Sequence, residues 1–362
     1  MSDYTAPEEI FLEITHACPM SCVHCSSFRE RERRFDRNAY MSVDRIKATL
    51  RSFAGCGGAK VVFSGGEPLL HPDLLPLIEY ATSLGLAVRL FSSGLVGLLS
   101  REVRSINLDS ATQLKRVGLS KIEFNLQGAT RATHERITRT RGSFERVIES
   151  ISNSRTAGLA VGVHFVPMRE NYREFERLVT LARDMRVDSI SVLRFVPQGR
   201  GEFYRDRLEM TAREFFEFGA ELARIRKECV DTEIRTGCPM NLVTIHEQER
   251  EPVKCGAAKT TAVILADGKV VPCAAFKQAE QFVAGSILDQ EFEKIWAQAP
   301  VFEELRRFDH SKSGGGCEQC SKLAESEGLC HAQRYAASGS IYHGHDPHCA
   351  SGLIQITRAG SL

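Results

Sequence analysis

The chain has no excess of either charge and no long apolar segment. Its 362 residues include 47 Lys and Arg against 46 Asp and Glu, so a net charge of +1 gives no overall attraction to nucleic acid or to an anionic membrane. No apolar run approaches the roughly eighteen residues that read as a membrane-spanning helix. The N-terminal residues lack the basic and apolar regions of a signal peptide. We therefore expect a cytoplasmic protein without nucleic-acid or membrane partners.

The cysteines are few for this length, but their spacing is patterned. Twelve cysteines are too few for a disulfide framework here, and clustered cysteines in a chain without a secretory signal indicate metal ligation. Cys56 and Cys229 lie outside every spacing pattern and are interpreted as buried thiols. The nine patterned cysteines are Cys18, Cys22, Cys25, Cys255, Cys273, Cys317, Cys320, Cys330 and Cys349.

Short apolar runs alternate with amphipathic stretches from residue 10 to about 195. This alternation indicates an α/β fold with a parallel sheet, and six strand–helix units favour a partial (β/α)6 TIM-like barrel over a closed one. In such a barrel the loops that follow the strands carry the chemistry. The expected strands are residues 10–14, 60–63, 87–91, 121–126, 160–166 and 189–195, and clear helical patterns cover 43–53, 74–84, 144–157 and 172–185.

The pattern changes after residue 200. A helix is expected over 211–228, and a β-hairpin over 262–271 because apolar runs flank Asp267-Gly268. A short helix near 292–296 leads into a loop-rich tail, which we expect to be organised by metal more than by an apolar core. The predicted parts are a barrel core (8–200), a helical connector (201–237), a cysteine-rich domain (238–350) and a C-terminal tail (351–362).

Cys18, Cys22 and Cys25 place three soft thiolates in the loop after the first strand. Such ligands suit an iron–sulfur cluster or zinc. Three thiolates would leave one iron of a four-iron cluster open to an outside ligand. The alternative is a structural zinc completed by His16 or His24.

Polar residues also follow the later strands. Gly65-Gly66-Glu67-Pro68 follows the second strand, where two glycines permit close backbone approach to a ligand and Glu67 can accept from an ammonium group. Arg194 could meet a carboxylate through a charge-assisted hydrogen bond. Each later strand-end residue is a candidate for a substrate contact or a structural polar group, and those considered as catalytic candidates are His164, Arg194 and Gln127.

The cysteine spacing and its place after the first strand resemble the radical S-adenosylmethionine (radical SAM) superfamily. The resemblance implies that Cys18, Cys22 and Cys25 hold a 4Fe–4S cluster whose open iron binds S-adenosylmethionine. An electron from the cluster would cleave that cofactor to a 5′-deoxyadenosyl radical, which abstracts hydrogen from the substrate. It also implies that His24 lies over the adenine, that the glycine motif meets the methionine amino group and that small polar residues meet the ribose. The resulting cofactor-binding candidates are His24, Gly65, Gly66, Glu67, Pro68, Ser92, Ser93, Asn125 and Arg194.

The C-terminal cysteines resemble a SPASM domain, which carries up to two auxiliary iron–sulfur clusters. The resemblance implies one cluster on Cys255, Cys273 and Cys330, and a second on Cys317, Cys320 and Cys349. Where most relatives have a further cysteine, this chain has Ser326 between two glutamates. An auxiliary site that is a structural zinc site, or empty, remains an alternative. The candidates for further ligands are Cys238, Glu325, Ser326, Glu327 and His331.

The resemblance implies an iron–sulfur oxidoreductase that modifies a substrate C–H bond. The main hypothesis is maturation of a ribosomally made precursor peptide, by a cross-link or a related change. The alternative is a dehydrogenase or decarboxylase for an aminocyclitol, sugar or tetrapyrrole, and a more remote one is a non-catalytic zinc or iron–sulfur scaffold. Expected partners are a reductant such as flavodoxin or ferredoxin and, since only seventeen residues precede Cys18, a separate peptide-carrier protein.

Overall fold

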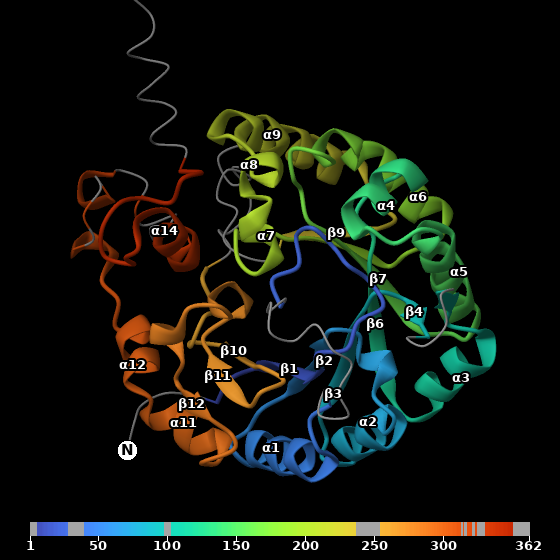
Figure 1. The fold of residues 1–362 in the computed structure, drawn as a ribbon, viewed down its shortest axis with the longest axis horizontal. Helices are drawn as coiled ribbons and strands as arrows, with labels where there is room; N and C mark the ends of the chain where they lie inside the picture. The colour runs from blue at the N-terminus through green and yellow to red at the C-terminus, as the bar shows by residue number, and fades with distance from the viewer. Residues whose placement is uncertain are drawn as a thin grey trace, which may run out of the picture.

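A ten-stranded sheet organises the computed structural model of the chain (Figure 1). The structure describes residues 6–27, 40–97, 103–236, 254–312, 314, 317–320, 323 and 330–349. All six strands expected in the barrel are present and run parallel to their neighbours. They are β1 (Glu9–Thr15), β2 (Lys60–Gly65), β3 (Ala87–Ser92), β6 (Leu119–Asn125), β7 (Ala160–Phe165) and β8 (Ser189–Val192).

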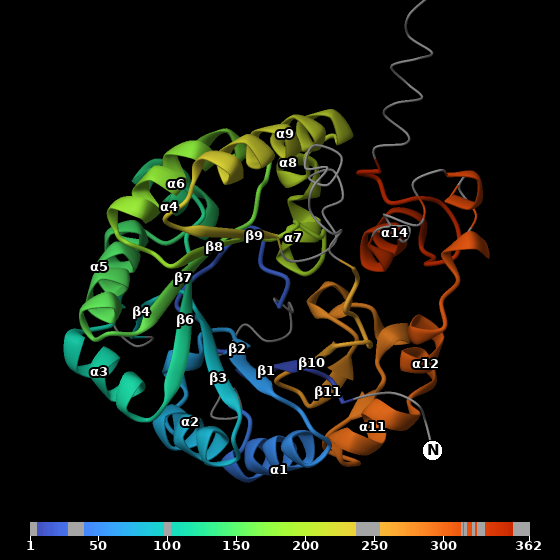
Figure 2. The ribbon, with the colours of Figure 1, turned by 180° about the vertical axis from the view of Figure 1, so that it is seen from behind.

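The helices surround the outer face of the curved sheet, as the two opposite views show (Figures 1 and 2). The helical patterns expected from the sequence are confirmed, and additional short helices cover the turns. Around the barrel lie α1 (Val43–Gly55), α2 (Leu74–Ser83), α3 (Leu108–Arg116), α4 (Arg131–Thr138), α5 (Ser143–Thr156), α6 (Phe175–Asp184), α7 (Arg200–Phe203), α8 (Arg205–Leu208) and α9 (Ala212–Glu228). A two-stranded ribbon, β4 (Leu95–Val96) with β5 (Arg104–Ser105), lies after β3.

Strand alternation separates an apolar outer face from a polar inner face. On β1, Ile10, Leu12 and Ile14 join the core under the helices, while Glu13 takes the opposite face and is still buried. The inner face of β6 likewise carries Lys121, beside Ser189 of β8 at 2.6 Å. The barrel interior is therefore lined by charged and polar groups, with Glu13 near the end of β1 that leads to the cysteines and with Lys121 and Ser189 near the opposite end of the strands.

The connector contains a strand that the sequence pattern did not reveal. We expected residues 201–237 to be helical, but β9 (Glu233–Thr236) pairs in parallel with β8 and extends the sheet. Only one residue of this strand, Ile234, is buried, so its apolar signal is too short to read. Before it, α9 begins at a complete capping box between Thr211 and Glu214, the kind of local signal that a sequence does show.

The C-terminal region extends the sheet of the barrel. The expected hairpin, β10 (Thr261–Ile264) and β11 (Lys269–Val271), is present, but β10 also pairs in parallel with β1, and β12 (Gly285–Ser286) follows β11. An apolar core extends into this region, since one buried cluster runs from Ile10 to Ile341, and the expected organisation by metal stays a prediction. This cluster includes buried faces of α11 (Phe292–Gln298) and α12 (Pro300–Arg306) and residues at and after α14 (His331–Ser338).

None of the helices within the described ranges has the length and apolarity needed to cross a bilayer.

Candidate radical SAM and auxiliary cluster sites

The three-cysteine loop, residues 18–25, follows β1 and is held through its backbone. The N–H groups of Ser21 and Val23 donate to the last carbonyls of α4, at 3.2 and 2.9 Å. On the other side, Arg200 of α7 donates from Nη1 to the carbonyl of Cys22 at 2.8 Å and from its N–H to the carbonyl of Cys25 at 2.9 Å. The cysteines are half-buried. Two helices from different parts of the barrel therefore fix the backbone that presents the thiols.

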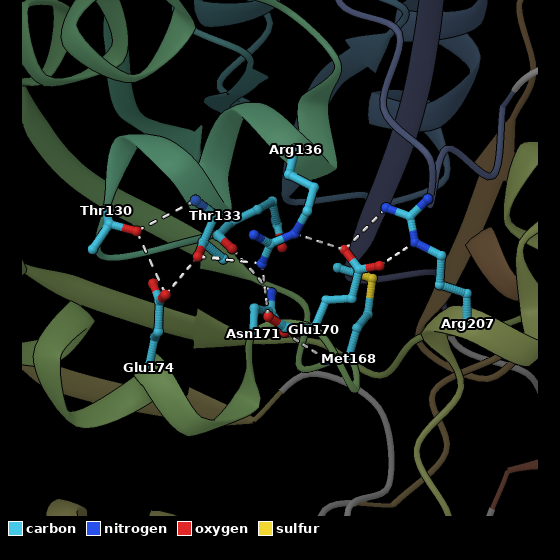
Figure 3. Close-up of polar contacts among 9 residues, drawn as sticks. Thr130, Thr133, Arg136, Met168, Glu170, Asn171, Glu174 and Arg207 are labelled. Atoms are coloured by element: carbon cyan, nitrogen blue, oxygen red, sulfur yellow. Dashed lines mark hydrogen bonds and ion pairs between the residues drawn. The ribbon is translucent and has the colours of Figure 1, made fainter.

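A network of charged contacts holds α4 in place (Figure 3). Glu174 accepts from Thr133 of the helix, and its other oxygen accepts from the N–H of Ala129 at 2.9 Å. Glu170 accepts from Arg136 of α4 at 3.2 Å and also from Arg207 of α8 (Figure 3). Because α4 supplies the carbonyls that bind the three-cysteine loop, this network indirectly supports the position of the thiols.

The donor set fits a soft, positively charged metal group. Burial, followed by the charge of neighbouring cysteines, raises the pKa of Cys22 to about 12 and that of Cys18 well above its usual value. Without a bound metal, thiols in this environment stay protonated, whereas a metal binds them as thiolates. Across the described ranges, no three His, Cys, Asp or Glu side chains are grouped so that they could hold one metal ion.

Glycine is sterically required where the second strand crosses the three-cysteine loop. A Cβ on Gly66 would lie 2.2 Å from the carbonyl oxygen of Ala17, and one on Gly65 would lie 2.3 Å from that of Thr15. Gly65 also has a φ of +128°, which side-chain-bearing residues avoid. The close approach is stabilised by hydrogen bonds from the Gly66 and Glu67 N–H groups to Thr15 and Ala17 at 2.7 and 2.6 Å.

Glu67 joins the ends of β2 and β3. It is fully buried, and its Oε1 accepts from Leu69 N–H at 3.0 Å and from the Ser92 hydroxyl at 2.8 Å. Its Oε2 accepts from the N–H of Ser93 at 2.6 Å and from the Ser93 hydroxyl. Burial raises the pKa of Glu67 to about 7, against the lowering effect of these bonds. An ammonium group would reach Glu67 only if a serine hydroxyl rotated away, because four donors already occupy the carboxylate.

His24 offers an unpaired ring nitrogen inside the three-cysteine loop. Its Nδ1 is buried and has no hydrogen-bond partner in the described part of the chain. Burial and then the charge of Arg200 lower its pKa to about 4, so the ring is neutral. A neutral ring beside the cysteines suits the stacking role expected for it, and its contact with adenine stays a prediction.

His164 and Gln127, two of the catalytic candidates, have different surroundings. Gln127 is fully buried, and its amide bonds to Asn125 at 2.7 Å and to the Val166 N–H at 3.0 Å, which favours a positioning role. His164 lies on the inner face, where Nε2 contacts Glu123 and the ring meets Phe91 edge-on at 4.1 Å between centroids.

Glu123 is the centre of a buried charge network on the inner face. It contacts His164, and Lys121 lies 2.7 Å from its other oxygen. Burial raises the pKa of Glu123, but the charges and hydrogen bonds of His164 and Lys121 lower it by more than burial raises it. The pKa of Glu123 is therefore well below its usual value.

Arg194, the third catalytic candidate, lies in an ion pair instead of facing open space. Its two terminal nitrogens each lie 2.7 Å from an oxygen of Asp346, and Nη2 lies 2.9 Å from His348 Nδ1. The side chains of Arg194 and Asp346 are 2% and 0% exposed. Asp346 also accepts from the N–H of Cys330 at 3.2 Å. This geometry favours a link between the barrel and the cysteine-rich region over the expected contact with a cofactor carboxylate.

The C-terminal cysteines lie on the side of the sheet beyond β10. Cys317 and Cys330 are buried, and Cys255, Cys273, Cys320 and Cys349 are half-buried. His331 is buried, and its Nε2 has no hydrogen-bond partner among the residues that the structure describes. Burial, followed by the charge of His310, lowers its pKa to about 3. The other candidates for further ligands lie outside the described residues, namely Cys238, Glu325, Ser326 and Glu327.

The segment after Cys273 contacts the two residues that directly follow the three-cysteine loop. Lys277 Nζ donates to Ser27 at 2.9 Å and forms an ion pair with Glu13 of β1 at 2.5 Å. Gln278 donates to the carbonyl of Ser26 at 2.8 Å. Sequence reasoning missed these residues, although Glu13 inside an apolar strand is a visible signal that the position faces something other than core. The contacts tie the segment after Cys273 to β1 and to the residues that directly follow the three-cysteine loop.

Comparison with known proteins agrees with this architecture. The family model of the Radical SAM superfamily matches residues 12–182, and that of the SPASM iron–sulfur cluster-binding domain matches residues 255–321. The chain is 27% identical to the PqqA peptide cyclase of Gluconobacter oxydans, covering 95% of this chain and 90% of the relative. It is 28% identical to the AdoMet-dependent heme synthase of Methanosarcina barkeri, covering 95% and 96%.

Its fold also matches the crystal structure of Streptococcus suis SuiB bound to the precursor peptide SuiA. The TM-score is 0.75 at 18% identity, over 95% of this chain and 76% of SuiB. The chain belongs to the radical SAM superfamily and carries a C-terminal SPASM domain, and it is accordingly an enzyme whose cofactors are S-adenosylmethionine and iron–sulfur clusters.

Proposed function

We propose that the enzyme oxidatively modifies a C–H bond in a ribosomally made precursor peptide. The observation that carries this proposal is the near full-length similarity to PqqA peptide cyclase, together with the same fold as SuiB bound to its precursor peptide. The mycofactocin maturase MftC of Mycobacterium ulcerans is similar over 96% of the chain.

Within this proposal, the three-cysteine loop holds the catalytic cluster through Cys18, Cys22 and Cys25. When bound, the cluster and S-adenosylmethionine supply a 5′-deoxyadenosyl radical. Gly65 and Gly66 allow the end of the second strand to pack against the backbone that leads into this loop, while Glu67 fixes Ser92 and Ser93.

The inner face of the barrel orients the substrate. Asn125 and His164 lie on neighbouring strands in register, at the same end of the sheet as the three-cysteine loop. The charge network around Glu123 keeps His164 fixed from below. Such a polar, buried surface can hold a peptide side chain or a small polar substrate away from water.

The test uses anaerobically reconstituted protein, S-adenosylmethionine and a chemical reductant, with 5′-deoxyadenosine measured by mass spectrometry. Synthetic peptides matching short reading frames beside the gene serve as substrates, and a modified peptide should lose two hydrogen atoms for each two-electron oxidation. No 5′-deoxyadenosine from cluster-replete protein would overturn the radical chemistry. Turnover of a small molecule but of no peptide would overturn the substrate class.

The second candidate is a dehydrogenase or decarboxylase for a small molecule, because similarity to the heme synthase is as extensive as that to the peptide cyclase. Adding tetrapyrroles, sugars and aminocyclitols to the same assay separates the two. A flavodoxin or ferredoxin as the reductant and a separate peptide-carrier protein belong to the proposal, and pull-down with the carrier encoded nearby tests the latter.

A further inference from the structure

Arg334 of α14 is buried against a cysteine of the SPASM region. The residue is 1% exposed and is among the largest fully buried side chains in the described part of the chain. Its Nη2 donates to Sγ of Cys317 at 3.2 Å, and its Nη1 donates to the carbonyl of Ile341 at 3.0 Å. A guanidinium cannot lose its charge, so its burial requires negative charge or strong acceptors nearby. A Cys317 thiolate supplies both.

The position of Arg334 is fixed by its neighbours. The helix begins directly after Cys330, and the Arg334 N–H donates to the Cys330 carbonyl at 3.0 Å. Gln333, one residue earlier, donates to the carbonyl of Phe195 after β8. The backbone of Arg334 is therefore fixed at the start of the helix beside Cys330, Gln333 ties this turn to the barrel, and the guanidinium contacts the Cys317 sulfur.

We propose that Arg334 is a positioning residue that raises the reduction potential of the auxiliary cluster bound through Cys317. Hydrogen bonds to ligand sulfurs and nearby charge are among the factors that set the potentials of iron–sulfur clusters. Reduction adds one negative charge to the cluster, and a fixed cation with an N–H···S bond stabilises that charge. Arg334 thereby makes the cluster a better acceptor for an electron released during substrate oxidation. This inference depends on one part of the proposal above, namely that Cys317 binds an auxiliary cluster.

The test is a redox titration of the auxiliary cluster in the reconstituted holoenzyme, followed by electron paramagnetic resonance. Arg334→Gln should lower the potential by about 59 mV or more, which is a tenfold change in a one-electron equilibrium. Arg334→Lys keeps the charge and should stay closer to the wild type. Arg45→Gln is the matched control, because Arg45 donates to the carbonyl of Ile287 at 2.7 Å, a backbone contact rather than a cysteine sulfur, and its loss should leave the potential unchanged.

Iron content separates failure of the inference from failure of the ligand proposal. Cys317→Ala that retains the full iron complement and auxiliary signal would show that Cys317 binds no cluster. Arg334→Gln with full iron and an unchanged potential would overturn the tuning role alone.

A measurement on the wild-type enzyme covers the case in which the Arg334 variants lose their clusters. In protein labelled with ¹⁵N in the arginine guanidinium, pulsed resonance of the reduced auxiliary cluster should detect a ¹⁵N coupling. No such coupling would overturn the contact.

Discussion

A methyl group at Gly66 should displace the three-cysteine loop. In Gly66→Ala the new Cβ would lie 2.2 Å from the carbonyl oxygen of Ala17 and 2.6 Å from that of His16, about 1 Å inside ordinary contact. These are backbone atoms, so no side-chain rotation relieves the clash. Moving the loop also breaks the bonds from Gly66 and Glu67 N–H to the loop side of β1. The two lost hydrogen bonds lower the free energy of unfolding by about 1 kcal/mol each, and overpacking lowers it by about 1–3 kcal/mol more, for a total of about 3–5 kcal/mol.

The expected result is lower iron incorporation at the first cluster, loss of S-adenosylmethionine cleavage and a lower free energy of unfolding. Chemical denaturation, iron analysis and the 5′-deoxyadenosine assay measure these three effects. Gly55→Ala is the matched control, because nothing lies within 4 Å of its Cβ at the end of α1, and it should be neutral or slightly stabilising. Wild-type iron content and cleavage in Gly66→Ala would refute the steric reasoning.

Three further predictions follow from the contacts described above. Cys22→Ala should abolish 5′-deoxyadenosine formation, while Cys56→Ala, at a thiol outside the site, should keep it; equal activity would exclude Cys22 as a ligand. Glu123→Gln should lower the free energy of unfolding by about 3 kcal/mol at pH 7. This deficit should shrink below pH 4.5, the ordinary pKa of the carboxyl, because the paired carboxyl has a lowered pKa and its stabilisation is lost as pH falls. Denaturation series at several pH values measure the deficit, and a deficit independent of pH would contradict the pairing. Asp346→Asn should lower the free energy of unfolding by about 3–5 kcal/mol, because it leaves the buried Arg194 without its counter-charge. In a double-mutant cycle, adding Arg194→Met should recover part of that loss, and simple additivity of the two effects would contradict the ion pair.

The sequence was sufficient for the barrel because its strands and helices are set by local patterns. Apolar runs bounded by turn residues mark each parallel strand, and the intervening helices show the regular amphipathic spacing. The glycine motif was readable for a similar reason, since adjacent glycines after a strand indicate a close backbone approach. Which atoms approach was not readable, because the contacts of Gly65 and Gly66 with Thr15 and Ala17 join segments about fifty residues apart.

Contacts between distant segments are what the sequence did not show. Nothing local indicates that residues 261–264 pair with β1, so the hairpin looked like part of an independent domain. Arg194 follows a strand, as a cofactor-binding residue would. Only the folded chain shows that Arg194 forms an ion pair with Asp346. The C-terminal core was underestimated because its apolar residues are spread over short helices and turns, and they become a core only when packed against the barrel.

The same long-range contacts imply that the two cluster-binding parts of the chain fold as one unit. Removing the region after residue 254 would expose the edge of β1 and leave Glu13 without Lys277 and Arg194 without Asp346. An unpaired strand edge and two buried, unpaired charges are each costly for a domain whose total stability is typically about 5–15 kcal/mol. The SPASM region therefore completes the barrel as well as holding cysteines, and a change in its packing should alter the three-cysteine loop through Ser26 and Ser27.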